Sequence, residues 1–234
     1  LAERLAGAGL AAVSFNTSGS GVGEDLEGFS EPEAFRRGTL SRQLEDVERV
    51  RQLALGGGLG PVDPARGGLF GHSRGGGVAL VHAAEAGDYR AVVTWAALDC
   101  FDRWDEPTKA TWRREGVLGV LNARTGQELP MGLEVLEDYE RHHARLDILA
   151  ACRRLRAPVL ALHGSADEAV EPAALERIAA ALPGDAGSRT RRVEGQGHTL
   201  GAVHPLTEVP SALRQAIDES VAWLSVHLGA EAPH

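Results

Sequence analysis

The sequence predicts an α/β fold built on a mostly parallel, doubly wound sheet. Short apolar runs alternate with segments of helical periodicity along most of the 234 residues, which is the pattern of strands joined by helical crossovers. Most of the runs are short and apolar, as expected of strands covered on both faces, and the last, 189–193, is polar-edged. Breaks rich in Gly and Pro separate them. Together these observations indicate helices on both sides of one central sheet.

The N-terminal part supplies two predicted helices and one predicted strand. Residues 1–9 match the last turns of a helix, with Gly9 at its C-terminal end. The apolar run 10–15 is predicted to be a buried strand, and the Gly- and Ser-rich segment 16–23 a loop that an acidic stretch continues. Apolar residues recur at helical spacing over 39–54, which predicts an amphipathic helix.

The same alternation continues towards the C-terminus. The predicted strands are 67–71, 91–97, 158–163 and 189–193, and the predicted helices are 75–86, 172–182 and 211–228. Pro172 fits the first turn of its helix because the N–H that proline lacks would have no partner there.

The alternation lapses between residues 99 and 155. This stretch contains a predicted turn at 124–127 and a predicted helix over about 133–152. We expect an insertion of about 99–155, a cap that folds over the sheet edge ahead of the strand 158–163. The whole chain, 1–234, is predicted to form a single domain, since no internal repeat or low-complexity linker divides it.

Composition limits the classes of function. Hydrophobic residues make up 43% and charged residues 24%, as in ordinary globular proteins. The net charge of −9 offers no electrostatic basis for a nucleic-acid partner, and no apolar run is long enough to span a membrane. Cys100 and Cys152 are predicted to be reduced structural residues. We expect a cytoplasmic protein, with export left open because the chain starts at Leu1, within a helix and without an initiator Met.

No metal or cofactor site is predicted. His142 and His143 are adjacent and cannot face one ion from one helix, because ligand pairs on a helix need a spacing of three or four residues. The segment 16–23 resembles a phosphate-binding loop only superficially, since it lacks the Gly-Lys-Ser/Thr ending.

The sharpest local signal is the G-x-S-x-G pattern around Ser73, placed between a predicted strand and a predicted helix. A sharp strand-to-helix turn lifts the serine oxygen above the carboxyl edge of the sheet and strains its backbone. Gly71 and Gly75 are expected to relieve the crowding at this turn. The backbone N–H of Arg74, at the start of the helix, is the predicted oxyanion donor.

A nucleophilic serine needs a base and an orienting carboxylate, in this fold in the chain order Ser, Asp, His. Asp167 follows the predicted strand 158–163, and His198 lies in a Gly-flanked loop after the strand 189–193. They are the candidate acid and base. Glu168 and Glu171 are the alternative acids. The alternative histidines are His72, His82, His142, His143 and His163.

Three motifs carry a resemblance to a known family: Gly-His-Ser-Arg-Gly-Gly, His-Gly-Ser-Ala-Asp and Gly-Gln-Gly-His. They resemble those of α/β-hydrolases, in particular the group of dienelactone hydrolases and prolyl-oligopeptidase-like esterases. The resemblance implies a triad of Ser73, Asp167 and His198 with the Arg74 amide as an oxyanion donor. Dienelactone hydrolases use a cysteine nucleophile, so Ser73 favours the esterase side of the group.

The resemblance also implies an earlier strand followed by a His-Gly motif that gives a second oxyanion donor. We therefore expect the N-terminal strands to be missing from this chain and a His-Gly pair to lie shortly before Leu1. A donor in the loop 16–23 is the alternative.

The resulting hypothesis is a serine hydrolase that cleaves a small-molecule carboxylic ester through an acyl-enzyme. The alternatives are a prolyl-oligopeptidase-like peptidase and a non-catalytic binding module of the same fold. Trp95, Trp104 and Trp112 are the candidate substrate-binding residues, with plain core packing as the alternative. The sequence names neither the ester nor the oligomeric state.

Overall fold

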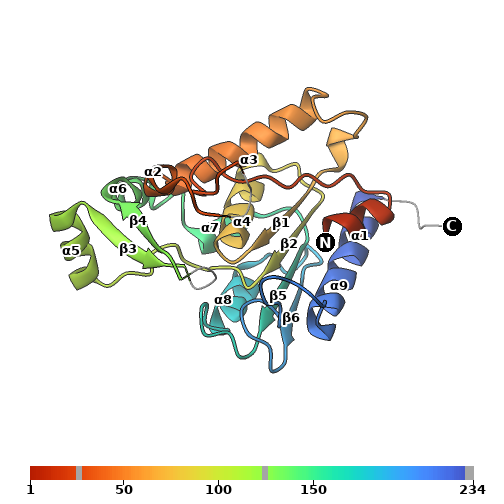
Figure 1. Ribbon diagram of the computed structural model, residues 1–234. Helices are drawn as coiled ribbons and strands as arrows, with labels where there is room; N and C mark the ends of the chain where they lie inside the picture. The colour runs from red at the N-terminus through yellow and green to blue at the C-terminus, as the bar shows by residue number, and fades with distance from the viewer. Residues whose placement is uncertain (25–27, 123–125, 230–234) are drawn as a thin grey trace. The chain divides into compact units, whose positions relative to one another are not determined.

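The computed structural model describes residues 1–24, 28–122 and 126–229 (Figure 1). The chain divides into two compact units. The first comprises Leu1–Ser14, Ala54–Phe101 and Asp147–His234, and the second comprises Phe15–Leu53 and Asp102–Leu146.

The first unit is built on a four-stranded parallel sheet with the strand order β1-β2-β5-β6. Its strands are β1 (Gly68–His72), β2 (Ala91–Trp95), β5 (Val159–Gly164) and β6 (Arg189–Val193). Its helices are α1 (Ala2–Gly7), the 3-10 turn η1 (Pro64–Arg66), α4 (Arg74–Ala86), α7 (Ile148–Arg154), α8 (Ala173–Ala181) and α9 (Ser211–Leu228). One row of paired residues across the sheet is Phe70, Val93, Leu160 and Arg189.

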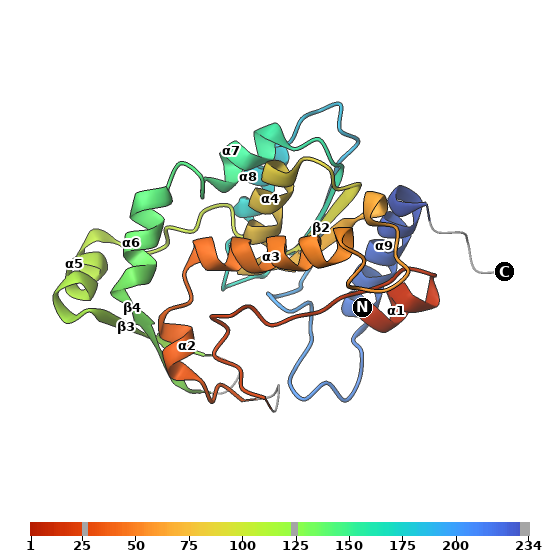
Figure 2. The same ribbon diagram turned by 90° about the horizontal axis from the view of Figure 1, so that it is seen from above.

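Helices cover both faces of this sheet, as the sequence predicts. In Figure 1, α4 lies on one face and α9 on the other. Figure 2 shows α1 beside α9, and α7 with α4 and α8. Side chains alternate between the faces of a strand, so Val93, Trp95 and Leu162 pack in the cluster that contains Trp223 and Leu224 of α9.

The second unit contains a two-stranded antiparallel hairpin and four helices among its described residues. The hairpin pairs β3 (Val117–Leu121) with β4 (Glu128–Gly132). The helices are α2 (Pro32–Arg36), α3 (Leu40–Leu55, which reaches two residues past the boundary), α5 (Glu106–Glu115) and α6 (Leu133–His142). Its core gathers around Trp112, which is fully buried and packs with Met131, Val135 and Leu136.

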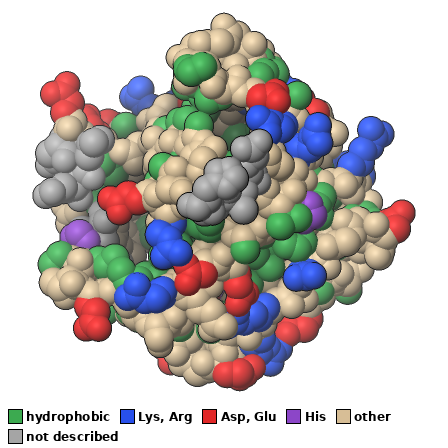
Figure 3. Space-filling view, turned by 90° about the vertical axis from the view of Figure 1, so that its right-hand side faces the viewer, with side chains coloured by type: hydrophobic (Ala, Val, Ile, Leu, Met, Phe, Trp, Pro, Cys, Tyr) green, Lys and Arg blue, Asp and Glu red, His purple; other side chains and the backbone are tan. Residues whose placement is uncertain are grey.

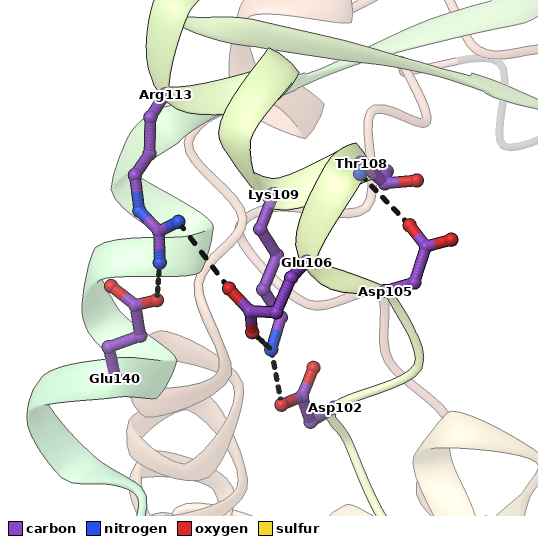
Figure 4. Close-up of polar contacts among 7 residues, drawn as sticks. All are labelled: Asp102, Asp105, Glu106, Thr108, Lys109, Arg113 and Glu140. Atoms are coloured by element: carbon purple, nitrogen blue, oxygen red, sulfur yellow. Dashed lines mark hydrogen bonds and ion pairs between the residues drawn. The ribbon is translucent and has the colours of Figure 1, made fainter.

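Ion pairs and caps fix α5 within the second unit (Figure 4). The carboxylate of Asp105 caps the helix by accepting from the Thr108 amide at 2.9 Å. The buried ammonium of Lys109 donates to Asp102 at 2.6 Å and to Glu106 at 3.3 Å, and Arg113 pairs with Glu140 of α6. A buried ammonium is stable only with such partners, so these contacts hold α5 against its neighbours in the unit.

Three sequence predictions of secondary structure differ from the structure. Residues 10–15 form no strand, because none of the described strands pairs with them; Val13 and Phe15 are 51% and 41% exposed. The predicted helix 133–152 is two helices, α6 and α7, because Asp147 caps a new helix by accepting from the Ala150 amide at 2.8 Å. The hairpin and the helices α2 and α5 were not predicted, and of the predicted turn 124–127, residues 124 and 125 lie outside the described residues.

None of the described helices has the length and apolar character needed to cross a membrane.

On the face shown in Figure 3, which carries some residues that are not described, acidic and basic side chains are interspersed with hydrophobic ones. The negative net charge is therefore not gathered into one acidic patch on that face. Neither Cys100 nor Cys152 forms a disulfide, and burial raises the pKa of the Cys152 thiol to about 12.

Candidate active site

The three candidate catalytic residues follow three parallel strands of the first unit. Ser73 comes directly after β1, Asp167 three residues after β5 and His198 five residues after β6. Carboxyl ends of parallel strands lie at one edge of a sheet, where ligands bind in open α/β folds. The topology therefore brings the three residues to the same edge.

Ser73 occupies the sharp turn that its motif predicts. Its φ of 55° and ψ of −120° lie in a region that non-glycine residues rarely adopt. The turn is held by the Ser73 amide, which donates to the Trp95 carbonyl at 2.8 Å, and by the Ser73 carbonyl, which accepts from Leu98 at 3.2 Å. The surrounding strands thus enforce the strained backbone.

The glycines of the turn differ in what they allow. A Cβ on Gly71 would lie 2.2 Å from the Gly75 carbonyl oxygen, so only glycine fits there. A Cβ on Gly75 itself would meet nothing within 4 Å, whereas one on Gly76 would lie 2.6 Å from the Ala97 Cβ. The prediction for Gly71 is confirmed, and the one for Gly75 is wrong. The close approach of α4 to the chain after β2 makes Gly76 the second required glycine.

This difference predicts the stability of two matched variants. Gly71→Ala is expected to lower the free energy of unfolding by about 3 kcal/mol or more, since backbone rather than a flexible side chain must move. Gly75→Ala is expected to change it by less than about 1 kcal/mol, because alanine favours the helix and finds open space. Urea unfolding of both variants measures this, and equal losses would contradict the assignment.

Asp167 accepts three hydrogen bonds, from the Ala169 and Val170 amides and from His198 Nδ1. Its Oδ1 accepts from the amides of Ala169 at 2.8 Å and Val170 at 2.9 Å. Its Oδ2 lies 2.8 Å from His198 Nδ1 and 3.2 Å from His163 Nε2. Burial acts to raise the pKa of this carboxyl, but the hydrogen bonds from Val170, His198 and Ala169 outweigh it and lower the pKa. Asp167 is therefore a fixed carboxylate at neutral pH.

His198 accordingly has a defined tautomer. A carboxylate can only accept, so the proton between Asp167 and His198 lies on Nδ1 of the imidazole. This leaves Nε2 as the nitrogen that can take up a proton. The His198 side chain is 22% exposed, so the ring is accessible at the surface of the first unit while its Nδ1 side faces the buried acid.

Backbone contacts lock the acid loop to the base loop. The Ala166 amide donates to the Gln196 carbonyl at 2.9 Å, and the Gly195 amide donates to Ser165 Oγ at 2.8 Å. The loops approach so closely that a Cβ on Gly164 would lie 2.2 Å from the Gln196 carbonyl oxygen. The glycine of the His-Gly-Ser-Ala-Asp motif is therefore a steric requirement of the Asp167–His198 pair.

The alternative acids lie away from this pair. Glu168 is exposed. Glu171 has a side chain that is 68% exposed and forms an ion pair with Arg177, which also binds Asp99. Among the three acidic residues of the segment, Asp167 is the one that contacts His198.

Two histidines that the sequence leaves as alternatives contact the Asp167–His198 pair. His163 is buried and its Nε2 lies 3.0 Å from the Val170 carbonyl oxygen as well as near Asp167. His72 Nε2 lies 2.9 Å from the His198 carbonyl oxygen, and the two rings are 4.7 Å apart. His72 directly precedes Ser73, so the residue next to the nucleophile candidate contacts the base candidate. The signal in the sequence is the position of each histidine inside a motif.

The role of His163 can be separated from its packing. We expect His163→Leu to lower kcat about 10-fold, since the Val170 carbonyl loses the N–H of His163, and Val170 in turn donates to Asp167. His163→Gln, which keeps an N–H near the same place, is expected to recover most of that loss. Steady-state kinetics on one ester, with thermal melts to confirm folding, measures both; equal kcat values for the two variants would assign His163 to packing alone.

Arg74 begins α4, where the first amides of a helix point out of its N-terminus. This position fits the predicted oxyanion role of its N–H. Its side chain is half-buried, and burial lowers the pKa of the guanidinium to about 10, so it stays charged at neutral pH.

Two of the three tryptophans predicted to bind substrate, Trp95 and Trp112, are buried within their own units. Trp95 is buried under α9 and its indole N–H donates to Ser220 Oγ at 3.0 Å. Trp112 is fully buried in the second unit and donates to the Met131 carbonyl at 2.9 Å. Trp104 is half-buried against the Trp112 ring. Burial with satisfied N–H groups assigns Trp95 and Trp112 to the cores of their units, which sequence patterns do not distinguish from a pocket wall.

Comparison with known proteins gives the fold and the family. Among solved structures, the chain is similar to a monoacylglycerol lipase of Paleococcus ferrophilus, with a TM-score of 0.65 and 19% identity over 96% of this chain and 87% of that one. It is similar to an esterase domain of Rhodothermus marinus, with a TM-score of 0.61 and 20% identity over 97% and 79%. It is also similar to a puromycin-hydrolysing peptidase of Mycobacterium tuberculosis, with a TM-score of 0.59 and 23% identity over 85% of this chain and 27% of that one.

These identities show a shared fold, the α/β-hydrolase fold that the motifs predict. No curated protein matches the sequence. Residues 2–231, nearly the whole chain, match the model of the prolyl oligopeptidase family. The chain is therefore a member of the prolyl oligopeptidase family (Peptidase_S9), a family of serine hydrolases with the α/β-hydrolase fold.

Proposed function

We propose that this chain hydrolyses a small-molecule carboxylic ester through an acyl-enzyme, with Ser73, His198 and Asp167 as the catalytic triad. The observation that carries the proposal is the hydrogen bond of 2.8 Å between His198 Nδ1 and a buried Asp167, at the sheet edge where Ser73 occupies a strained turn. Strain, burial and a fixed tautomer cost stability, and they recur together at catalytic sites.

The mechanism follows from the tautomer of His198. Nε2 takes the proton of Ser73 Oγ as that oxygen attacks the ester carbonyl, and Asp167 stabilises the imidazolium that forms. The Arg74 amide stabilises the oxyanion. The imidazolium then gives its proton to the departing alcohol, which leaves an acyl-Ser73. Water, deprotonated by the same Nε2, releases the acid and restores the enzyme.

The similar solved structures include a lipase and an esterase domain, which supports an ester as the substrate. They also include a puromycin-hydrolysing peptidase, of which the chain covers 27%. A peptidase activity is the second candidate, supported by the family description and by that similarity.

A substrate panel tests the two candidates. p-Nitrophenyl esters of graded acyl length are compared with aminoacyl and prolyl p-nitroanilides at equal concentration of protein. We expect turnover of at least one ester with kcat/KM at least about 10²-fold above that of every anilide, a margin that differences in site contacts readily supply. The reverse order would make the protein a peptidase. Turnover of neither, together with no labelling by a fluorophosphonate, would support a non-catalytic binding module.

A further inference from the structure

The loop that carries His198 has little regular structure of its own. From Glu194 to Pro210 the chain forms no helix or strand. Gly195, Leu200 and Gly201 have positive φ, so the backbone does not follow a helix or strand that would place the imidazole. The position of His198 therefore depends on contacts that the loop makes with the rest of the first unit.

These contacts come from two sides. Ser165 and Ala166 hold the loop on the side of the acid, through the hydrogen bonds to Gly195 and Gln196. On the side of the nucleophile, His72 Nε2 lies 2.9 Å from the carbonyl oxygen of His198 itself. A carbonyl oxygen only accepts, so Nε2 of His72 carries the hydrogen and donates it. The two imidazole rings also pack at 4.7 Å with an angle of 49°.

We propose that His72 is a positioning residue that holds the backbone of His198 against the turn that carries Ser73. This inference rests on the proposed function of the Ser73–His198–Asp167 triad. His72 ends β1 and is covalently joined to Ser73, so one side chain ties the distance between nucleophile and base to the rigid end of a paired strand. A displacement of about 1 Å between reacting groups costs up to about 10²-fold in rate. A contact that prevents such a displacement therefore supports the rate of catalysis.

The charge of His72 fits this role. Burial lowers its pKa, while its hydrogen bond to the His198 carbonyl and the charge of Asp167 act in the opposite direction, and His198 and His163 act with burial. The net lowering keeps the ring neutral at neutral pH. A neutral ring avoids repulsion of the imidazolium that forms on His198 during catalysis, and it still donates from Nε2.

Two variants of similar length separate the hydrogen bond from the packing. His72→Gln keeps an N–H donor near the position of Nε2, whereas His72→Met fills similar space without a donor. The kcat and KM of both are measured on one p-nitrophenyl ester, per active site titrated with a fluorophosphonate. We expect His72→Met to lower kcat about 10- to 100-fold with KM within about 2-fold, since positioning acts on the reacting groups. His72→Gln is expected to stay within about 3-fold of the parent, because a donor remains.

Hydrogen exchange gives a second measurement that needs no turnover. Amides of residues 195–200 are expected to exchange faster in His72→Met than in the parent and His72→Gln, while those of α9 are unchanged in all three. Equal exchange and equal kcat in all three proteins would overturn the proposal. Equal losses of kcat in His72→Gln and His72→Met, with unchanged exchange, would also overturn it. An inactive, unlabelled parent would instead refute the proposed function, and the exchange comparison would then decide the role of His72 alone.

Discussion

Ser73→Ala is expected to lower kcat for ester hydrolysis by about 10⁶-fold, the scale of loss when a nucleophile is removed from a serine protease triad. The fold is expected to survive. The Ser73 side chain makes no capping hydrogen bond to α4, and alanine bears the positive φ no worse than serine does. The change therefore removes the reacting oxygen and little else.

The measurement is turnover of one p-nitrophenyl ester by parent and variant, with circular dichroism melts of both. Ser225→Ala, which removes a hydroxyl in the last turns of α9, is the matched control and is expected to keep parental turnover. Turnover by Ser73→Ala comparable to that of the parent would remove Ser73 from the mechanism.

Asp167→Asn is expected to lower kcat by about 10⁴-fold, the effect of a wrong imidazole tautomer. The structure gives the reason. Two backbone amides, those of Ala169 and Val170, donate to Oδ1, so the oxygen of an asparagine must take that place. Its NH₂ group then faces Nδ1 of His198, which must give up its hydrogen and present a lone pair. The hydrogen moves to Nε2, and the ring cannot accept the proton of Ser73.

The matched control is Glu171→Gln, four residues along the chain. Glu171 is exposed and binds Arg177 rather than His198. The kcat of Glu171→Gln is therefore expected to stay within about 2-fold of the parent value, because an exposed ion pair contributes little energy. Steady-state kinetics on the same ester compares the two variants. A large loss in Glu171→Gln with near-parental turnover in Asp167→Asn would mean that the acid is Glu171.

Local sequence patterns predict the parts of the fold that local interactions determine. The turn at Ser73 and the acid after β5 are each marked by glycine and by the end of an apolar run, and the histidine after β6 is marked by its flanking glycines. Chain order then suggests that they meet, and the structure brings Asp167 and His198 into contact. Their catalytic roles stay a prediction that the experiments above test.

Other features depend on partners distant in sequence. An apolar run becomes a strand only with a neighbour, which residues 10–15 lack among the described strands. Whether Gly75 or Gly76 must be glycine depends on where Ala97 lies. A tryptophan such as Trp112 can line a pocket or pack in a core. Its burial depends on the β3–β4 hairpin, which the sequence did not predict. The contact of His72 with His198 spans 126 residues, so the position of His72 inside its motif does not by itself predict that contact.

Covalent labelling of Ser73 tests the central claim most directly. The parent, Ser73→Ala and His198→Ala are treated with a fluorophosphonate, and peptide mass spectrometry locates the adduct and follows its rate of formation. The account predicts one adduct, on the peptide that contains Ser73, with none in Ser73→Ala and a rate at least about 10²-fold lower in His198→Ala, the lower end of the contribution of a general base. An adduct on another residue, or an unchanged rate in His198→Ala, would contradict it.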